Sequence, residues 1–567
     1  MLKSSGAMAA ATLLSRVLGM VREMAYMAFM NVGWVNDAFQ YAFAIPNLFR
    51  RLLGEGALTA AFIPIFKEKE KIHGEREMWR AANAVISGLV IVTSIIVALG
   101  IFGISLALPV VKSAKPQPVI LQINNPDAGN QLLYQNYIQS KTNLDYDGQF
   151  KTKSEIKWES TVLMLQLLRM MFPYLLLVCL AATMMGMLNA RGHFFIPAMG
   201  ATMLNIVMIA SVFWLAPKFG INLPKEQRLP IQVFALAYGV LAAGVAQAAF
   251  QVPTLWRDGF RYQWVSPWHN ETVRLVMRRM IPGTIGVAAF QINVAIVPLI
   301  AFFVGPGIVS SFNGAVRLME LPQGIFGVSL ATYLLPTLAG LATDKNYSEF
   351  RSTLRQGLST LIFLNLIASV LLVALAEPIV RLLFEHGKFT EASTVRVAYA
   401  LACLAPGLVM FSTVNILARA FYALGDTKTP MKISIFCLAV NFFIAIVLLL
   451  FSPLREGGLG IANTITSCFN MGLLLFALRK KLGKLEMESL RANLLKLIPI
   501  AIVAGVTAWM WMRIWQTKFG HATVALKIGE VFVPAAIAGI VYWLAANAVK
   551  IPAAKELSDF IFAKLKK

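Results

Sequence analysis

Long apolar segments separated by short polar ones run through the whole chain. Each segment is long enough to cross a hydrocarbon core of about 30 Å, which takes about 20 helical residues. None shows the apolar–polar alternation of a membrane-spanning strand, and backbone polar groups in lipid must be bonded internally, so we expect α-helices. The pattern predicts fourteen spans, at residues 6–30, 34–53, 81–111, 160–188, 195–217, 230–255, 272–304, 308–340, 350–376, 395–422, 430–451, 457–481, 494–515 and 526–549.

Two short motifs recur, and each recurrence lies six spans after its first copy. "MLNARGHFFIP" at 187–197 and "FYALGDTKTP" at 421–430 share Ala, Gly and Pro at matching positions, and "GALTAAFIP" at 56–64 is echoed by "GVSLATYLLP" at 327–336. A shift of six spans implies two six-helix lobes of the same orientation. We therefore expect an all-α polytopic membrane protein with two pseudo-symmetric lobes and two extra C-terminal helices.

The expected boundaries follow from these spans. The N-terminal lobe covers 1–255, the C-terminal lobe covers 256–481, and 482–567 holds the last two spans and a cytoplasmic tail. One long polar segment, 112–159, interrupts the first lobe on the outer side. It is rich in Asn, Gln, Asp and Pro, and either a mobile surface loop or a small folded cap fits it.

Composition supports a membrane protein and explains the high net charge. Hydrophobic residues make up 58% of the chain and charged residues 14%, which excludes a water-soluble globule. The net charge of +23 invites a nucleic-acid partner, but Lys and Arg concentrate in the loops on the side of the two termini. That distribution matches the positive-inside rule, so we expect both termini in the cytoplasm and no nucleic-acid binding.

Several arginines lie inside the expected spans. At a rise of about 1.5 Å per residue, Arg16 and Arg317 fall near the membrane midplane, and Arg22 and Arg50 lie toward opposite faces. An arginine at a helix centre costs about 2.5–3.5 kcal/mol by insertion scales, so these side chains should face a wet cavity. Arginine suits bidentate phosphate binding, and an anionic, phosphorylated cargo follows.

Acidic and amide residues close to these arginines leave a second interpretation open. Glu23, Asp37, Glu55 and Glu320 are spaced so that helix-local or cross-helix ion pairs with the arginines can form. A scaffold whose charges only pair with one another fits these spacings as well. Asn47 follows a proline that should kink the second span, and its amide can satisfy the freed backbone groups.

Neither catalysis nor a metal site is indicated. All five histidines fall in loops, the four cysteines fall in spans, and no phosphate-binding loop or nucleophile elbow stands in a suitable context. We expect a transporter without a cofactor or metal, and not an enzyme.

Four stretches resemble the MurJ/MviN family of lipid II flippases, in the multidrug/oligosaccharidyl-lipid/polysaccharide exporter superfamily. They are "SRVLGMVRE" at 15–23, "NDAFQYAFAIPNLFRRLLGEGALTAAFIPIF" at 36–66, "RLMELPQGIFGVSLATYLLP" at 317–336 and "RAFYALGDTKTPM" at 419–431. The resemblance covers essentially all spans and omits the loop at 112–159.

The resemblance implies a fourteen-helix protein of the bacterial inner membrane. Such a protein moves lipid II, the undecaprenyl-pyrophosphate-linked disaccharide-pentapeptide, from the cytoplasmic to the periplasmic leaflet by alternating access for peptidoglycan synthesis. It implies substrate-binding roles for Arg16, Arg22, Arg50 and Arg317, and supporting or gating roles for the polar residues named above. Membrane lipids are the other expected partners, and a monomer is expected.

The chain also departs from the family pattern. Val316 stands where an acid often precedes the arginine, so Glu320 becomes the expected partner of Arg317. The spans 272–304, 430–451 and 457–481 hold no Asp or Glu, which argues against a sodium site there. We expect membrane potential or an ion gradient, with protons through Asp37, Glu23 or Glu320, to drive transport. The rival function is a cation-coupled multidrug antiporter of the same superfamily, which depends on carboxylates more than on arginines.

Overall fold

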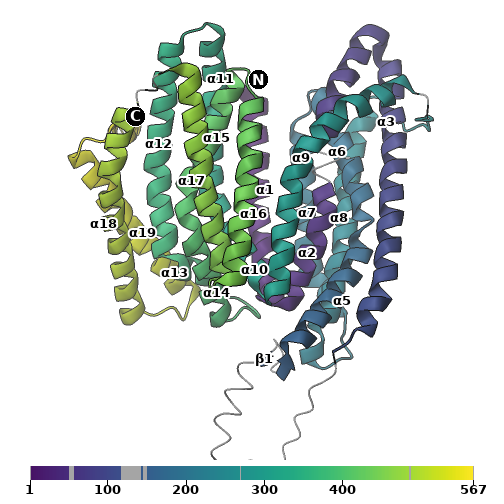
Figure 1. The fold of residues 1–567 in the computed structure, drawn as a ribbon, viewed down its shortest axis with the longest axis horizontal. Coiled ribbons are helices and arrows are strands. Elements are labelled where there is room, and N and C mark those ends of the chain that lie inside the picture. The colour runs from purple at the N-terminus through teal and green to yellow at the C-terminus, as the bar shows by residue number, and fades with distance from the viewer. Residues whose placement is uncertain are drawn as a thin grey trace, which may run out of the picture. The chain divides into compact units, whose positions relative to one another are not determined.

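The protein is almost entirely α-helical in its computed structural model (Figure 1). The structure describes residues 2–49, 57–116, 142–144, 150–268, 270–483, 485 and 487–565. Two compact units divide the chain, Met1–Ser310 and Ser311–Lys567. Residues 256–310, which the sequence assigns to the second lobe, have their contacts within the first unit, and the lobe arrangement stays a prediction.

Among its described residues, the first unit has the long helices α1 (Leu2–Met30), α2 (Trp34–Phe49), α3 (Ala57–Ser113), α5 (Lys153–Met171), α6 (Tyr174–Ala190), α7 (Phe195–Ala210), α8 (Leu229–Arg257) and α9 (Glu271–Val304). A short antiparallel pair, β1 (Thr142–Leu144) and β2 (Phe150–Thr152), precedes α5. The rest of the expected loop 112–159 lies mostly outside the described residues.

The second unit continues from α10 (Ile308–Pro322), which begins three residues before the unit boundary. Its further helices are α11 (Ser329–Thr343), α12 (Tyr347–Ala374), α13 (Ala376–Phe384), α14 (Glu391–Leu404), α15 (Leu408–Ala423), α16 (Lys428–Phe451), α17 (Arg455–Leu482), α18 (Glu488–Lys518), α19 (Val524–Ala548) and α20 (Pro552–Leu565).

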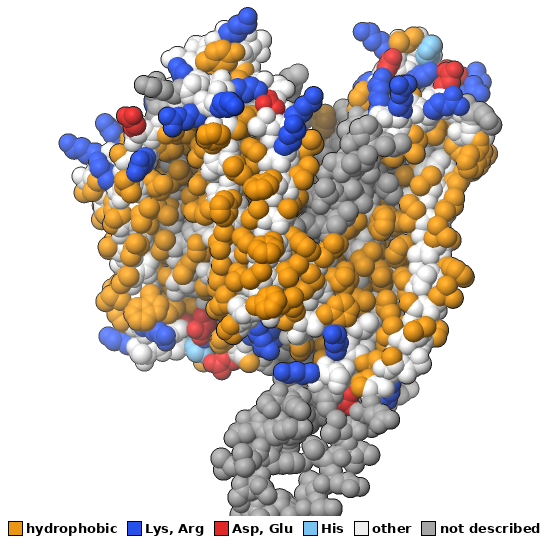
Figure 2. Space-filling view, in the orientation of Figure 1, with side chains coloured by type: hydrophobic (Ala, Val, Ile, Leu, Met, Phe, Trp, Pro, Cys, Tyr) orange, Lys and Arg blue, Asp and Glu red, His pale blue; other side chains and the backbone are white. Residues whose placement is uncertain are grey.

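Ten helical segments among the described residues are long and apolar enough to cross a membrane, or eleven if the bent pair α5 and α6 forms one span. The bend between α5 and α6 is 46°. The remaining expected spans, 6–30, 34–53 and 272–304, overlap α1, α2 and α9, which are not among these candidate segments, so the number of fourteen spans stays a prediction. Figure 2 shows apolar side chains over the middle of the helices and Lys and Arg gathered near their ends, as a membrane protein requires.

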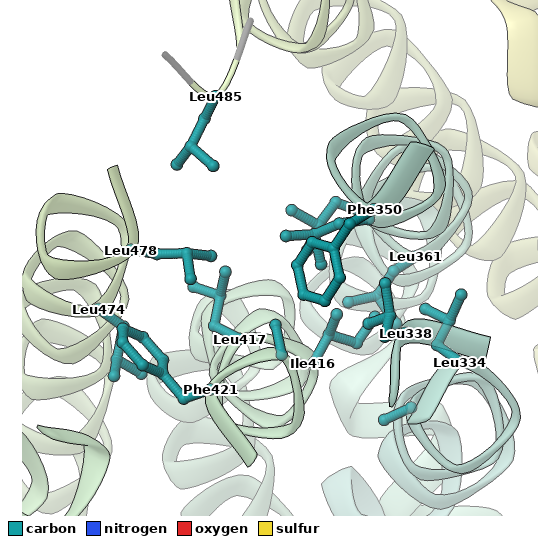
Figure 3. Packing of buried hydrophobic residues seen from close by; sticks show 14 residues of the cluster. Leu334, Leu338, Phe350, Leu361, Ile416, Leu417, Phe421, Leu474, Leu478 and Leu485 are labelled. Atoms are coloured by element: carbon teal, nitrogen blue, oxygen red, sulfur yellow. The ribbon is translucent and has the colours of Figure 1, made fainter. Parts of the chain in front are cut away.

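Each unit has its own apolar core. In the first unit α1 packs on α7, α2 on α5, and α3 on both α6 and α9. In the second unit, leucines of α11, α12, α15 and α17 pack around Phe350 and Phe421 (Figure 3). The pair α18 and α19 packs on α12 through small residues such as Ala504 and Ala538, which permit close helix approach. The C-terminal helix pair is therefore a packed part of the second unit.

The echoed motifs form the same turn in both units. Gly192 and Gly425 follow α6 and α15 with φ of 87° and 73°, a left-handed conformation that favours glycine. The next residue in each turn donates its N–H five residues back, His193 to Leu188 O and Asp426 to Phe421 O. These bonds satisfy carbonyls at the helix end, as in a Schellman motif. The recurrence noticed in the sequence is a recurrence of local structure.

A carboxylate and a nitrogen-bearing side chain pair at each turn, with the two partners exchanged between the units. His193 Nε2 lies 3.0 Å from an oxygen of Asp258, just after α8, whereas Asp426 accepts a 2.8 Å bond from Lys481 at the end of α17. Bonds from the Lys481 ammonium and the Thr429 N–H lower the pKa of the Asp426 carboxyl far below its ordinary value. The acid is contributed by the helix end in one unit and by the turn in the other.

Candidate functional site

Arg22 is a buried cation on the face of α1 that packs against α7. Its Nη1 donates a 3.1 Å hydrogen bond to Asn205 Oδ1, and the guanidinium carbon lies 5.5 Å from the centre of the Tyr26 ring. Its Nη2 is 3.8 Å from Glu23 Oε2, and its buried Nε has no described hydrogen-bond partner. The strongest contact that orients this cation is thus a neutral amide.

Asn205 is itself held in position by a hydrogen bond to the backbone of α1. Its Nδ2 donates a 3.1 Å bond to Ser15 O, and the side chain is buried. Gly19 of α1 faces this side chain, and a Cβ at Gly19 would lie 3.8 Å from Asn205 Nδ2. Asn205 therefore links the Arg22 head group to the α1 backbone, and its amide is part of the site.

Arg16 lies on α1 as well, but its side chain is exposed. Among the described residues, no hydrogen bond or ion pair to the Arg16 guanidinium is present. α1 continues without a break past Gly19, so the two arginines are fixed along one helix, six residues apart. About 9 Å of helix rise separates them.

The corner between α1 and α2 positions Asp37. Asn31 takes a left-handed φ of 59° after α1, and Asn36 Nδ2 donates a 2.6 Å bond to its carbonyl. The buried Asp37 carboxylate accepts the backbone N–H groups of Gly307 and Ser310, the latter at 2.7 Å. An anion at a helix N-terminus is favourable, so Asp37 anchors the start of α10.

Arg317 and Glu320 lie on α10 in the second unit, and both are substantially exposed. Arg317 Nη1 is 2.8 Å from Glu320 Oε2, an i,i+3 pair within one helix. The expectation that Glu320 partners Arg317 is confirmed. Such exposed helical pairs contribute only about 0.2–0.5 kcal/mol, so an anionic ligand can displace the carboxylate.

The remaining predicted residues are partly outside the structure. Asn47 is half-buried on α2, directly after Pro46, and the helix continues past the proline to Phe49. Arg50 and Glu55 lie outside the described residues. Arg16, Arg22, Glu23, Asp37 and Asn47 belong to the first unit, and Arg317 and Glu320 belong to the second.

Sequence reasoning missed a second buried charge cluster, in the second unit. Glu530 of α19 is fully buried and accepts bonds from Arg381 of α13, at 2.7 Å, and from Gln516 of α18. Arg381 also pairs with Glu377. An acid inside the expected span 526–549 was the available signal. The cluster joins α13 to the C-terminal helix pair.

No described group of three or more His, Cys, Asp or Glu is arranged to hold a metal ion. In the first unit, the site contains the Arg22 guanidinium, oriented by the Asn205 amide, and the exposed Arg16 guanidinium on the same helix. The Asp37 carboxylate nearby in sequence is bonded to the start of α10. Guanidinium groups bind phosphate oxygens through paired hydrogen bonds.

Comparisons with known proteins point to one family. A family model described as "Lipid II flippase MurJ" matches residues 26–118 and 150–528, and so omits most of the expected loop. The "Probable lipid II flippase MurJ" of Haemophilus influenzae is 30% identical over 88% of this chain and 91% of its own length. The "Lipid II flippase MurJ" of Burkholderia cenocepacia is 32% identical over 83% and 82%.

Solved structures agree on the fold. A structure titled "Lipid II flippase MurJ, inward closed conformation" aligns with a TM-score of 0.67 at 22% identity, covering 94% of this chain and 98% of that one. An inward-facing multidrug resistance transporter of the MATE family, in the MOP superfamily, aligns with a TM-score of 0.58 at 15% identity, covering 84% and 96%. The chain belongs to the lipid II flippase MurJ family.

Proposed function

We propose that this protein is a lipid II flippase of the bacterial inner membrane, which carries the lipid-linked peptidoglycan precursor from the cytoplasmic to the periplasmic leaflet. The observation that carries the proposal is Arg22, a buried cation whose nearest described hydrogen-bond partner is the neutral Asn205 amide. A cation oriented in this way keeps its charge for an anionic ligand. The pyrophosphate of lipid II is such a ligand.

The exposed and the buried arginines have different roles in binding the substrate. Arg16, which is exposed, makes the first contact with the pyrophosphate, and Arg22 binds it in a fixed orientation. Arg317 binds a phosphate oxygen in place of Glu320, and Arg50 assists entry of the head group. Asp37, Glu23, Asn47 and Glu55 support or gate the site. Alternating access then exposes the head group on the other side.

The proposed architecture has fourteen spans in two six-helix lobes, with α18 and α19 added to the second. Both termini face the cytoplasm because Lys and Arg are concentrated on that side. The protein acts as a monomer, and membrane potential or an ion gradient drives it. No cofactor takes part.

The test is complementation in bacteria depleted of their own flippase. Cells carry the wild-type chain or versions with Arg16→Ala, Arg22→Ala, Arg50→Ala or Arg317→Ala, and surface-accessible lipid II is measured on spheroplasts. We expect survival with the wild type and accumulation of inward-facing lipid II with Arg22→Ala. Survival and normal lipid II exposure with all four variants would reject the proposal.

A matched set of carboxylate variants separates the flippase from the antiporter. Glu23→Gln, Asp37→Asn and Glu320→Gln remove the acids available to bind a coupling cation. The flippase account expects each to retain more lipid II transport than Arg22→Ala. Complete loss of lipid II transport in the carboxylate set with full transport in the arginine set would contradict the role proposed for the arginines.

A further inference from the structure

A basic cavity opens in the second unit where α12, α17 and α18 have their ends. It has a volume of about 720 Å³, and its lining includes Arg355, Arg479, Arg491 and Glu488. Three guanidinium groups against one carboxylate leave an excess of positive charge.

The backbone adds donors to the same cavity. α18 begins at Glu488, its N-cap is Met487, and no described side chain caps it. The first N–H groups of an α-helix lack intrahelical acceptors and favour phosphate. Met487, Glu488 and Ser489 all line the cavity, so this helix start borders the arginines.

Part of the cavity lining is apolar. Leu475 and Phe476 of α17 line it, and Phe476 is 69% exposed. Leu485, also in the lining, belongs to the core cluster of Figure 3. The cavity therefore combines a cationic rim with apolar surface at the level where membrane helices end, which is where lipid head groups meet acyl chains.

A second cavity of about 240 Å³ shares Arg355 and Ser489 with the first. Its lining is rich in hydroxyls and amides, namely Ser352, Gln356, Ser359, Thr360 and Asn493. Glu556 of α20 also lines it and accepts a 2.9 Å bond from Gln356. Hydroxyl and amide groups suit a polyol, whereas Glu556 disfavours a second anionic group.

We propose that the two cavities bind one phospholipid with a single phosphate and a polyol head group. The phosphate lies among Arg355, Arg479 and Arg491, the polyol occupies the hydroxyl-lined cavity, and the acyl chains lie along Phe476. The linings of the two cavities include none of the residues proposed to bind lipid II, and this proposal does not depend on the proposed function.

The test is lipid binding to the purified full chain, measured by native mass spectrometry with lipids of matched acyl chains. Phosphatidylglycerol should bind at least tenfold more tightly than phosphatidylethanolamine, and more tightly than phosphatidylserine. The double variant Arg479→Gln/Arg491→Gln should lose most of this preference. Lys480→Gln, an exposed neighbour that lines neither cavity, should stay within twofold of the wild type.

Two further binding measurements distinguish a phospholipid from a free anion and a polyol head group from other head groups. Glycerol 3-phosphate and inorganic phosphate should not displace phosphatidylglycerol at millimolar concentration, and displacement would show a site for free anions instead. Equal binding of phosphatidylglycerol and phosphatidylserine would overturn the polyol assignment. Equal phosphatidylglycerol affinity in the double variant and the wild type would overturn the site, provided that both melt at the same temperature in phosphatidylethanolamine.

Discussion

Arg22 in the first unit and Arg317 in the second were singled out by the same depth argument, yet their surroundings differ. Arg22 is buried, and the amide of Asn205 orients it from another helix. Arg317 is exposed and bonded to Glu320 on its own helix. One cation is fixed in position by tertiary packing, and the other is balanced by a local acid.

This difference shows two ways in which a protein can hold a guanidinium group before an anionic ligand binds to it. Arg22 donates its hydrogen bond to a neutral amide, and the nearest carboxylate, that of Glu23, lies 3.8 Å away, beyond hydrogen-bond distance, so the ligand displaces no hydrogen-bonded acid. A guanidinium paired with an exposed carboxylate must release it first, at a cost of a few tenths of a kcal/mol. Arg22 should therefore contribute most of the binding energy and Arg317 should adapt to the ligand.

The largest expected effect is that of Arg22→Ala. Losing hydrogen bonds to a charged group costs about 1.5–3 kcal/mol, which corresponds to about a 10- to 150-fold loss of lipid II affinity. Arg22→Lys keeps the charge without the planar fork and should recover only part of the affinity. Wild-type affinity in Arg22→Ala would contradict the contrast between the two arginines.

The second largest effect is expected for Asn205→Ala, which removes the hydrogen-bond acceptor of Arg22 and keeps the arginine itself. We expect about a fivefold to tenfold loss of lipid II affinity, because one charge-assisted hydrogen bond is lost. Asn205→Asp is the control for the acceptor, since it keeps an oxygen for Arg22 but offers no donor to Ser15 O. If Asn205→Ala binds as well as wild type, the amide does not position the arginine.

Asp37→Asn should affect stability rather than binding. Removing a negative charge that accepts two N–H groups at the start of α10 should cost about 0.5–2 kcal/mol. A lower melting temperature with lipid II affinity within twofold of wild type is the expected result. A large affinity loss at unchanged melting temperature would instead place Asp37 in the binding or coupling step.

The smallest effect is expected for Glu320→Gln. Releasing an exposed i,i+3 partner from Arg317 should raise lipid II affinity by at most about twofold, and the difference should fade at high salt. The measurement is a binding titration at low and high ionic strength. A strong loss of affinity would mean that Glu320 contacts the ligand and does not merely balance the arginine.

Much of the fold followed from hydrophobic pattern and turn chemistry. The described residues of the expected spans are almost all helical because lipid leaves the backbone few alternatives, although α3 begins well before its span and the span 160–188 is divided between α5 and α6. Gly192 and Gly425 marked equivalent turns because only glycine adopts their φ easily. The short helix α13 and the packing of α19 on it were not predicted, since amphipathic segments of nine residues carry little periodic signal.

The charged residues of the site could be predicted from the sequence, but the side chains that bond to them could not. Insertion cost singles out an arginine in an apolar segment, so Arg22 and Arg317 were found. Asn205, a single amide within an apolar helix, is compatible with many packing roles, and only the contact between α1 and α7 reveals its bond to Arg22. Glu530 was visible as a charge in an expected span, but its partner Arg381 is distant in sequence.

The most direct test of the central claim measures what part of the ligand Arg22 recognises. Purified wild-type and Arg22→Ala proteins are titrated with lipid II, undecaprenyl diphosphate and undecaprenol. The account predicts that wild type binds both diphosphates and binds the alcohol at least tenfold more weakly, and that Arg22→Ala lacks this discrimination. Equal binding of the alcohol and the diphosphate by the wild type, or unchanged discrimination in Arg22→Ala, would contradict it.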